Sequence, residues 1–434
     1  MEKEDCYNTA VAKTLIQRDK ACIWHPYTRI QNARDPIPII KGKGVYLYAE
    51  DGTKYIDGIS SWWVNLHGHV HPYIVEKISE QAAAIEHVIF ADFTHPTAIQ
   101  LAEKLIQFLP GVMGKVFYSD NGSTAVEVAL KIALQYWFNS NSKTKRKKVI
   151  CFNRGYHGDT FGAMSVGERG LFNRPFWNHL FEVEFIDPPF SCNEEKSLEQ
   201  LRAILEREES ACFIFEPLIL GVGGMHIYQS RALDALLNLC RDYHVLTIAD
   251  EVMTGFGRTG PLFACEYLTE QPDMICLSKG LTGGFMPLGV TACKNFIFES
   301  FRSDELSKSF LHGHSYTGNP LACSAALASF ELLEKSECDL QRKRIAEQHQ
   351  GFCKKWRNHP KLNRCESIGT ILVLEYVANE QTNYQNSLRD KLYGYFLERK
   401  ILLRPLGNIV YVMPPYCISP EELTYIYEVI IDTL

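Results

Sequence analysis

The sequence predicts an α/β protein, with a large domain built on a mostly parallel sheet flanked by helices and a smaller α+β domain. Between about residues 112 and 325, short continuous apolar runs alternate with longer segments of helical pattern. Strands that are apolar on both faces are typical of parallel sheets covered by helices. After about residue 330, a helix rich in Lys, Glu and Arg (330–356) precedes two further strands, near 370–376 and 409–413. This change of character predicts the second domain.

The expected strands of the large domain lie at residues 116–118, 149–152, 212–215, 245–249 and 274–277, with helices at 124–138 and 231–243. The apolar stretch 45–48 and the turn at 50–53 predict a β-hairpin that joins the smaller domain. We therefore predict an N-terminal segment (1–65) that joins the small domain, a large domain (66–330) and a C-terminal small domain (331–434). Ligands of such sheets bind beyond the carboxyl ends of the strands, so the residues after each run are candidates for a site.

Composition narrows the class of protein. The chain has 434 residues, of which 46% are hydrophobic and 22% charged, so a large packed core is expected rather than disorder or a coiled coil. A net charge of −6 provides no basic field for nucleic acid. No apolar run reaches the roughly 18–20 residues that span a bilayer. The charged N-terminus lacks a signal-peptide pattern, and 14 cysteines without a CxxC pair indicate reduced thiols. We expect a cytoplasmic enzyme without nucleic-acid or membrane partners.

A polar turn follows the first expected strand and precedes a helix. Gly122 and Ser123 lie at the start of that helix, where free backbone N–H groups and a hydroxyl suit a phosphate group. Ordinary N-capping by Ser and Thr explains the same residues equally well.

Two other strands end in residues that carry chemistry. Asp250 closes an apolar strand, where a carboxylate requires a cation or a salt bridge. Lys279 follows another strand and is a candidate amine nucleophile. Together with the phosphate site, these are the groups that pyridoxal phosphate requires: an amine for a Schiff base, an acid for the ring nitrogen and N–H groups for the phosphate. Tyr156 follows a third strand, and we expect its ring to stack on the cofactor rather than only to fill core.

Three further segments would indicate other kinds of binding site, and we reject these interpretations. The segment 255–260 matches G-x-G-x-x-G, but no clear helix start follows it and the adjacent acids would repel a pyrophosphate. Three histidines alternate at 67–71, but a glycine and a proline indicate a turn and no cysteine stands at metal spacing, so no metal site is predicted. The basic run 143–148 is expected to be a solvated loop.

The segments 249–260 and 278–280 resemble the class III aminotransferases of fold type I, and the resemblance extends from about residue 24 to 416. Four segments (24–28, 58–63, 312–320 and 404–416) resemble the biotin-pathway branch of that class. That branch transfers an amino group from S-adenosylmethionine to 8-amino-7-oxononanoate and gives 7,8-diaminononanoate. The resemblance implies pyridoxal 5′-phosphate as cofactor and a homodimer with shared active sites.

The resemblance also implies roles for individual residues. Lys279 would hold the cofactor through a Schiff base and move the proton, and Asp250 would pair with the ring nitrogen. The phosphate would be bound by Gly122 and Ser123, and by His314 and Ser315 of the neighbouring subunit. The substrate would be contacted by Tyr156, Trp62, Gly313, Arg404 and Tyr411, with Arg404 binding its carboxylate. Tyr27 would line the channel and is counted with the catalytic residues.

The chain departs from the pattern of the class at two places. His314-Ser315 replaces Pro-Thr, which keeps a hydroxyl but changes the channel wall, and Leu220 stands where many relatives have Gln. No residue decides between S-adenosylmethionine and lysine as amino donor. Another class III enzyme acting on ω-amino acids, and a non-catalytic protein that binds a phosphate ligand, are the alternatives. The pair Trp62-Trp63 and Arg404 argue against the former, and Lys279 opposite Asp250 argues against the latter.

Overall fold

The computed structural model describes residues 14–380, 382 and 384–434. Its centre is a seven-stranded sheet of order β4-β12-β11-β10-β7-β5-β6. Only β12 runs antiparallel to its two neighbours, so the prediction of a mostly parallel sheet is confirmed. The strands are β4 (Met113–Ser119), β5 (Lys148–Phe152), β6 (Val183–Ile186), β7 (Ser210–Phe215), β10 (Leu246–Asp250), β11 (Met274–Leu277) and β12 (Gly289–Lys294).

Helices bury both faces of this sheet because successive side chains of a strand point to opposite sides. Ile150 and Phe152 of β5 belong to one apolar cluster, whereas Val149 and Cys151 belong to another that contains the buried face of α5. The helices of this region are α3 (Pro72–Ala84), α4 (Pro96–Phe108), α5 (Gly122–Ser140), α6 (Phe161–Ser165), α7 (Glu194–Leu205), α8 (Ser230–Asp242), α9 (Asn295–Glu299) and α10 (Pro320–Leu333). Between β7 and α8 lies a small hairpin, β8 (Ile219–Leu220) with β9 (His226–Ile227).

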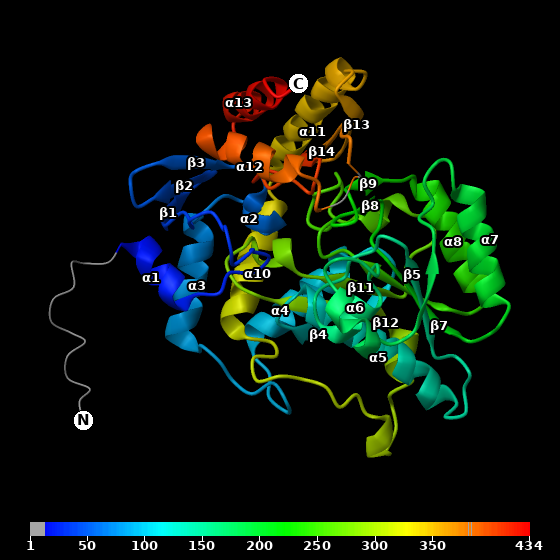
Figure 1. Cartoon of the computed structure of the whole chain (residues 1–434). Helices are drawn as coiled ribbons and strands as arrows, with labels where there is room; N and C mark the ends of the chain where they lie inside the picture. Colours follow the sequence, from blue (N-terminus) through cyan, green and yellow to red (C-terminus); the bar gives the residue numbers. More distant parts are fainter. Residues whose placement is uncertain (1–13, 381, 383) are drawn as a thin grey trace, which may run out of the picture.

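The remaining elements gather at one end of the molecule (Figure 1). One sheet contains β13 (Leu362–Ile368), β14 (Ile371–Tyr376) and β16 (Ile409–Val412). Another has the order β1-β2-β3-β15, made of β1 (Ile39–Lys43), β2 (Tyr46–Ala49), β3 (Lys54–Asp57) and β15 (Ile401–Leu402). The expected hairpin is therefore present, and β3 pairs in parallel with β15 from the far end of the chain. The remaining α-helices are α1 (Leu15–Cys22), α2 (Ser60–Trp63), α11 (Ser336–Trp356), α12 (Leu388–Glu398) and α13 (Pro420–Ile431).

One expected helix is two. Residues 330–356 were expected to form a single helix, but α10 ends at Leu333 and α11 begins at Ser336, with an extended backbone at Lys335 between them. Nearly every side of α10 is buried, whereas α11 carries the exposed Lys, Glu and Arg side chains, so the break separates a core helix from a surface helix.

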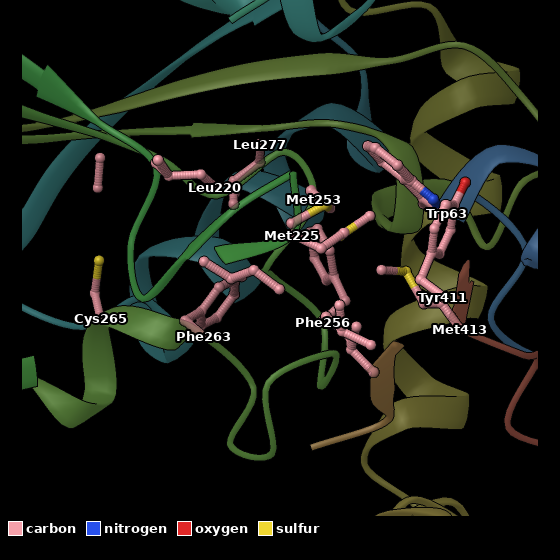
Figure 2. Packing of buried hydrophobic residues seen from close by; sticks show 14 of the residues in the cluster. Trp63, Leu220, Met225, Met253, Phe256, Phe263, Cys265, Leu277, Tyr411 and Met413 are labelled. Carbon is pink, nitrogen blue, oxygen red and sulfur yellow. The ribbon is translucent and has the colours of Figure 1, made fainter. Parts of the chain in front are cut away.

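One apolar cluster contains residues of both the seven-stranded sheet and the C-terminal strands. Trp63, Tyr411 and Met413 lie in the same buried cluster as Leu277 at the end of β11 (Figure 2). The predicted limits at residues 65 and 330 therefore do not coincide with a break in the core, and they stay a prediction. None of the helices in the described ranges has the length and apolar character needed to cross a membrane.

Candidate active site

A cavity of about 750 Å³ lies beyond the carboxyl ends of the parallel strands. A volume of this size is ordinary for a small-molecule site. Its walls contain nine residues predicted from the sequence, which come from distant parts of the chain: Tyr27, Trp62, Gly122, Ser123, Tyr156, Asp250, Lys279, Arg404 and Tyr411.

The N-terminus of α5 forms one wall. Asn121 caps the helix by accepting a hydrogen bond from the Thr124 N–H (3.0 Å), so Ser123 is not the cap. In the described part of the chain, the amides of Gly122 and Ser123 have no acceptor, as expected for a first helical turn. A Cβ at Gly158 would lie 2.1 Å from Ser123 Oγ, so only glycine lets this neighbouring loop close on the helix end. The result is a compact group of donors suited to an anion.

Asp250, at the end of β10, meets a histidine. Its Oδ2 lies 2.7 Å from His157 Nδ1, and its Oδ1 accepts from the Val252 N–H at 3.1 Å. The His157 side chain is buried, and its Nε2 has no partner among the described residues. This contact with a buried ring orients the Asp250 carboxyl group at the cavity wall. The adjacent Glu251 is held instead by the Ala264 and Cys265 N–H groups and has a structural role.

Lys279 follows β11 directly and begins a short 3₁₀ turn with a left-handed backbone (φ 44°). Its Nζ lies 4.4 Å from the centre of the Trp63 ring. Removal from water lowers the pKa of the Lys279 amine to about 8, against the opposing effect of the Asp250 and Glu216 carboxylates. A neutral amine, which is the nucleophilic form, is therefore accessible near physiological pH.

This shifted pKa predicts a pH dependence of stability in the protein without cofactor. Between pH 8 and 10.5 the unfolded chain holds the Lys279 proton more tightly than the folded chain, so folding stability rises with pH across that window. Relative to a Lys279→Met variant, the wild type should gain up to about 3 kcal/mol over this range. Urea unfolding of both proteins at several pH values measures the difference, and Lys294→Met, which removes a salt-bridged lysine outside the cavity but keeps Lys279, should keep the rise seen in the wild type.

Glu216 is a site residue that the sequence did not single out. Its Oε1 accepts from the Tyr156 N–H (3.0 Å) and its Oε2 from the Gly221 N–H (2.9 Å). Burial raises the pKa of this carboxyl to about 7. Glu216 directly follows β7, as Asp250 and Lys279 follow or end their strands, so its position at a strand end was the signal that could have found it.

Arg404 and Trp62 lie next to each other in the cavity wall. The guanidinium carbon of Arg404 lies 4.9 Å from the centre of the Trp62 ring. In the described part of the chain no carboxylate forms a salt bridge with Arg404, although most other buried or half-buried arginines have internal partners. Burial raises the pKa of the nearby Tyr411 phenol and keeps it neutral. An arginine without an internal counter-charge is suited to bind a ligand carboxylate.

Tyr27 closes the cavity from the N-terminal segment. Its hydroxyl donates to Asp159 and lies 3.4 Å from the Tyr156 hydroxyl. Burial, aided by the bond to Asp159, raises the pKa of Tyr27 to about 12. Two more aromatic residues complete this wall, Phe172 against Tyr27 (5.9 Å) and Tyr384 against Phe172 (5.0 Å). No motif marked Phe172 or Tyr384, because their loops come together only in the folded chain.

Four of the residues discussed from the sequence lie elsewhere. Gly313, His314 and Ser315 do not line this cavity, and Gly313 and Ser315 are exposed on the surface. This placement neither supports nor contradicts a role in a neighbouring subunit's site, which stays a prediction. Leu220 is fully buried in the core, and Val222 lines the cavity from the same segment.

The alternating histidines do not converge on one point. His67 Nε2 lies 3.1 Å from Ser329 Oγ, and burial lowers the pKa of His67 to about 3. His69 instead contacts Asp57. Among the described residues, no group of three or more His, Cys, Asp or Glu side chains is placed to hold a metal ion.

The cavity therefore combines a buried amine, a carboxyl group, an anion-binding helix end and an aromatic ring. These groups fit pyridoxal phosphate: the amine faces the same space as the acid, and Gly122 and Gly158 leave room for a phosphate where a Cβ would meet Val252 or Ser123. The separate guanidinium adds a position for a substrate carboxylate.

Comparison with known proteins gives consistent matches over nearly the whole chain. Residues 29–434 match the family model described as Aminotransferase class-III. A protein from Synechococcus elongatus named adenosylmethionine-8-amino-7-oxononanoate aminotransferase is 47% identical over 95% of this chain and 98% of its own length. A protein of the same name from Helicobacter pylori is 38% identical over 95% of each chain.

Solved structures give the same result. The enzyme of that name from Methanocaldococcus jannaschii superposes with a TM-score of 0.91 at 36% identity, over 96% of this chain and 98% of the other. An omega transaminase from Pseudomonas jessenii, in complex with PMP, superposes with a TM-score of 0.90 at 26% identity, over 97% and 98% of the two chains. The range matched by the family model contains every residue that lines the cavity except Tyr27.

Proposed function

The chain belongs to the class III aminotransferases, and we propose that it transfers an amino group from S-adenosylmethionine to 8-amino-7-oxononanoate, which yields 7,8-diaminononanoate for biotin synthesis. The observation that carries this proposal is the position of Arg404. Its guanidinium lines the same cavity as Lys279 and has no carboxylate partner among the described residues. The acceptor has a carboxylate at one end of an apolar chain and its reacting ketone toward the other. The aromatic wall of Trp62, Tyr27 and Phe172 suits the chain between them.

Class III aminotransferases use pyridoxal phosphate, and in this chain we propose that Lys279, Asp250, Gly122, Ser123 and Tyr156 hold it. When bound, the cofactor supplies an electron-withdrawing ring and accepts the amino group between the two substrates. The helix end and the Ser123 hydroxyl bind its phosphate, and the Tyr156 ring packs beside its flat face. Asp250, oriented by His157, keeps a proton on the ring nitrogen.

Other steps of the proposed reaction are assigned to side chains of the protein. Lys279 would hold the cofactor, and its neutral amine would accept the Cα proton of the donor and later give a proton back. A pKa near 8 suits both directions of this transfer. Glu216 holds the backbone of Tyr156, and Arg404 fixes the far end of the acceptor. The aromatic wall excludes water from the reacting centre.

A homodimer completes this proposal. Two neighbouring surface segments expose large apolar side chains, each between 60% and 71% exposed: Ile89, Phe93, Leu306, Leu311 and Tyr316. The segments touch one another, because the rings of His87 and Tyr316 are 5.1 Å apart and Asn319 Nδ2 donates to the Glu86 carbonyl at 3.1 Å. Such a patch is typical of an interface. Gly313, His314 and Ser315 lie within it, which suits a role in the partner's site.

The reverse half-reaction tests the proposed function. Adding 7,8-diaminononanoate to the purified protein loaded with pyridoxal phosphate should bleach the visible band of the bound cofactor, because the diamine gives up an amino group to it. S-adenosylmethionine and lysine are then added to separate samples, and we expect only the former to bleach the band. Bleaching by lysine would show that lysine is the amino donor, and the proposed acceptor would be unaffected. A band that resists the diamine but bleaches with ornithine or 4-aminobutyrate would show a class III enzyme with a different substrate.

A further inference from the structure

The short helix α2, between β3 and the cavity, has a left-handed backbone. Ser60, Ser61, Trp62 and Trp63 have φ angles of 51°, 47°, 82° and 72°, and none of them is a glycine. Residues with a Cβ avoid this region because the side chain approaches the following carbonyl oxygen. Four such residues in a row persist only where surrounding contacts determine the conformation, and strain of this kind gathers at functional sites.

The turn places two indole rings in the cavity wall. Trp62 lies 5.4 Å from the Tyr27 ring and beside the Arg404 guanidinium, where the substrate carboxylate is proposed to bind. Trp63 lies over the Lys279 amine and 5.9 Å from Tyr411 (Figure 2). Because the two residues are adjacent, any change of the backbone between them redirects both rings.

A buried carboxylate holds this turn. Asp57 is 0% exposed, and its Oδ1 accepts from the N–H groups of Ile59 (3.2 Å) and Ser61 (2.9 Å). Its Oδ2 accepts from Ser61 Oγ (2.7 Å) and contacts His69 Nε2 at 2.9 Å. Two of these four bonds come from the left-handed residues themselves. The carboxylate therefore holds the turn together with the bond from Ser60 Oγ to the Met413 carbonyl (2.8 Å) and the backbone bond from Trp63 N–H to the Ile59 carbonyl (2.8 Å).

His69 in turn fixes the carboxylate. Its Nδ1 lies 3.2 Å from Asn65 Nδ2, which can only donate, so the proton is on Nε2 and points at Asp57. The His69 side chain packs tightly against the backbone of Gly42, since a Cβ at Gly42 would lie 2.7 Å from the His69 Cβ. Ser61 Oγ bonds to Asp57 and not to His69, so these residues are not arranged as a nucleophile with its base. Neither Asp57 nor His69 is among the described residues that line the cavity.

We propose that Asp57 and His69 are positioning residues of the transamination: they hold the left-handed turn and thereby set Trp62 at the substrate end and Trp63 at the Lys279 amine. The reaction named here rests on the proposed function, but the positioning role does not depend on which acceptor is used. Removal of the His69 donor leaves one oxygen of Asp57 with one partner fewer, loosens the turn and displaces the two indoles. The residues that line the cavity all keep their identity.

A pair of variants of equal side-chain length tests this role. His69→Gln keeps an N–H donor for Asp57, whereas His69→Met does not. We expect the KM of the Met variant for 8-amino-7-oxononanoate to rise about tenfold with kcat changed less than about threefold, and the Gln variant to stay within about twofold of wild type. The near-ultraviolet circular dichroism of the tryptophans, measured without cofactor, should change only in the Met variant.

His349→Met is the control for a loss of stability alone. His349 is fully buried and bonds to the Tyr427 hydroxyl and the Thr370 carbonyl, away from the cavity. It should lower the melting temperature and leave KM and the circular dichroism unchanged. Equal KM values for the Gln and Met variants at position 69, or a KM effect matched by His349→Met, would overturn the proposal. If the wild type does not use the oxononanoate, the proposed function fails, and the same comparison is made with the amine that bleaches its cofactor band.

Discussion

Replacement of Lys279 by alanine is expected to lower turnover by about four orders of magnitude, while the protein stays folded and retains cofactor by its phosphate. The reason is that no other described amine lines the cavity, so the covalent anchor and the proton carrier are lost together. Removing a buried amine that is costly to charge below its pKa of about 8 should not destabilise the fold at neutral pH. The measurement is the single-turnover rate of the diamine half-reaction.

Two comparisons make this result specific. Lys294→Ala removes a lysine that bonds to Asp273 outside the cavity, and it should keep normal turnover. Adding a small primary amine such as methylamine should restore part of the activity of Lys279→Ala, because a free amine can carry the proton. A Lys279→Ala protein with more than about a hundredth of the wild-type rate would show that another group moves the proton.

Arg404→Leu is expected to raise the KM for 8-amino-7-oxononanoate about a hundredfold, with a smaller change in kcat. A hydrogen-bonded charge pair contributes roughly 1.5–3 kcal/mol, and about 1.4 kcal/mol corresponds to a factor of ten. The guanidinium lies beside the Trp62 ring, whereas the reacting amine lies over the Trp63 ring, so we expect its loss to weaken binding more than chemistry. Steady-state kinetics with the acceptor varied measures both constants.

The matched comparison uses the substrate. An amino ketone of the same chain length but without the carboxylate should be turned over equally by the wild type and by Arg404→Leu. With 8-amino-7-oxononanoate, the KM of Arg404→Lys should lie between those of the wild type and Arg404→Leu, because lysine keeps the charge but cannot donate two parallel hydrogen bonds. A hundredfold defect that persists with the ketone that lacks the carboxylate would assign Arg404 a structural role in the wall rather than recognition of the carboxylate.

The reacting end of the site could be predicted from sequence because of where its residues stand on strands. Asp250 and Lys279 close or follow apolar runs, and the carboxyl ends of parallel strands meet at one edge of a sheet. Gly122 begins the helix after β4 for the same reason. The strands β6 and β12 were missed because Glu184 interrupts the first and small residues dominate the second, so neither forms a continuous run of large apolar side chains.

The substrate end could be identified only by resemblance. Trp62 and Arg404 belong to distant segments, and nothing in local pattern indicates that they meet. The left-handed turn at Ser60–Trp63 contradicts the local preference of every residue in it and depends on Asp57 and His69 from tertiary contacts. His69 itself stood in a motif that was considered only for metal binding. Glu216 and His157 act through other residues, and such indirect roles become visible only when distances are known.

The parallel pairing of β3 with β15 has a consequence for how the enzyme becomes active. Trp62 follows β3 and Arg404 follows β15, so the pocket proposed for the acceptor's carboxylate is closed by contacts between segments that are far apart in the sequence. Contacts of such long sequence separation form late and slowly. A growing chain can assemble the strands that carry Asp250 and Lys279 well before it can recognise the acceptor. We therefore expect the residues that carry the chemistry to come together before those proposed to select the acceptor.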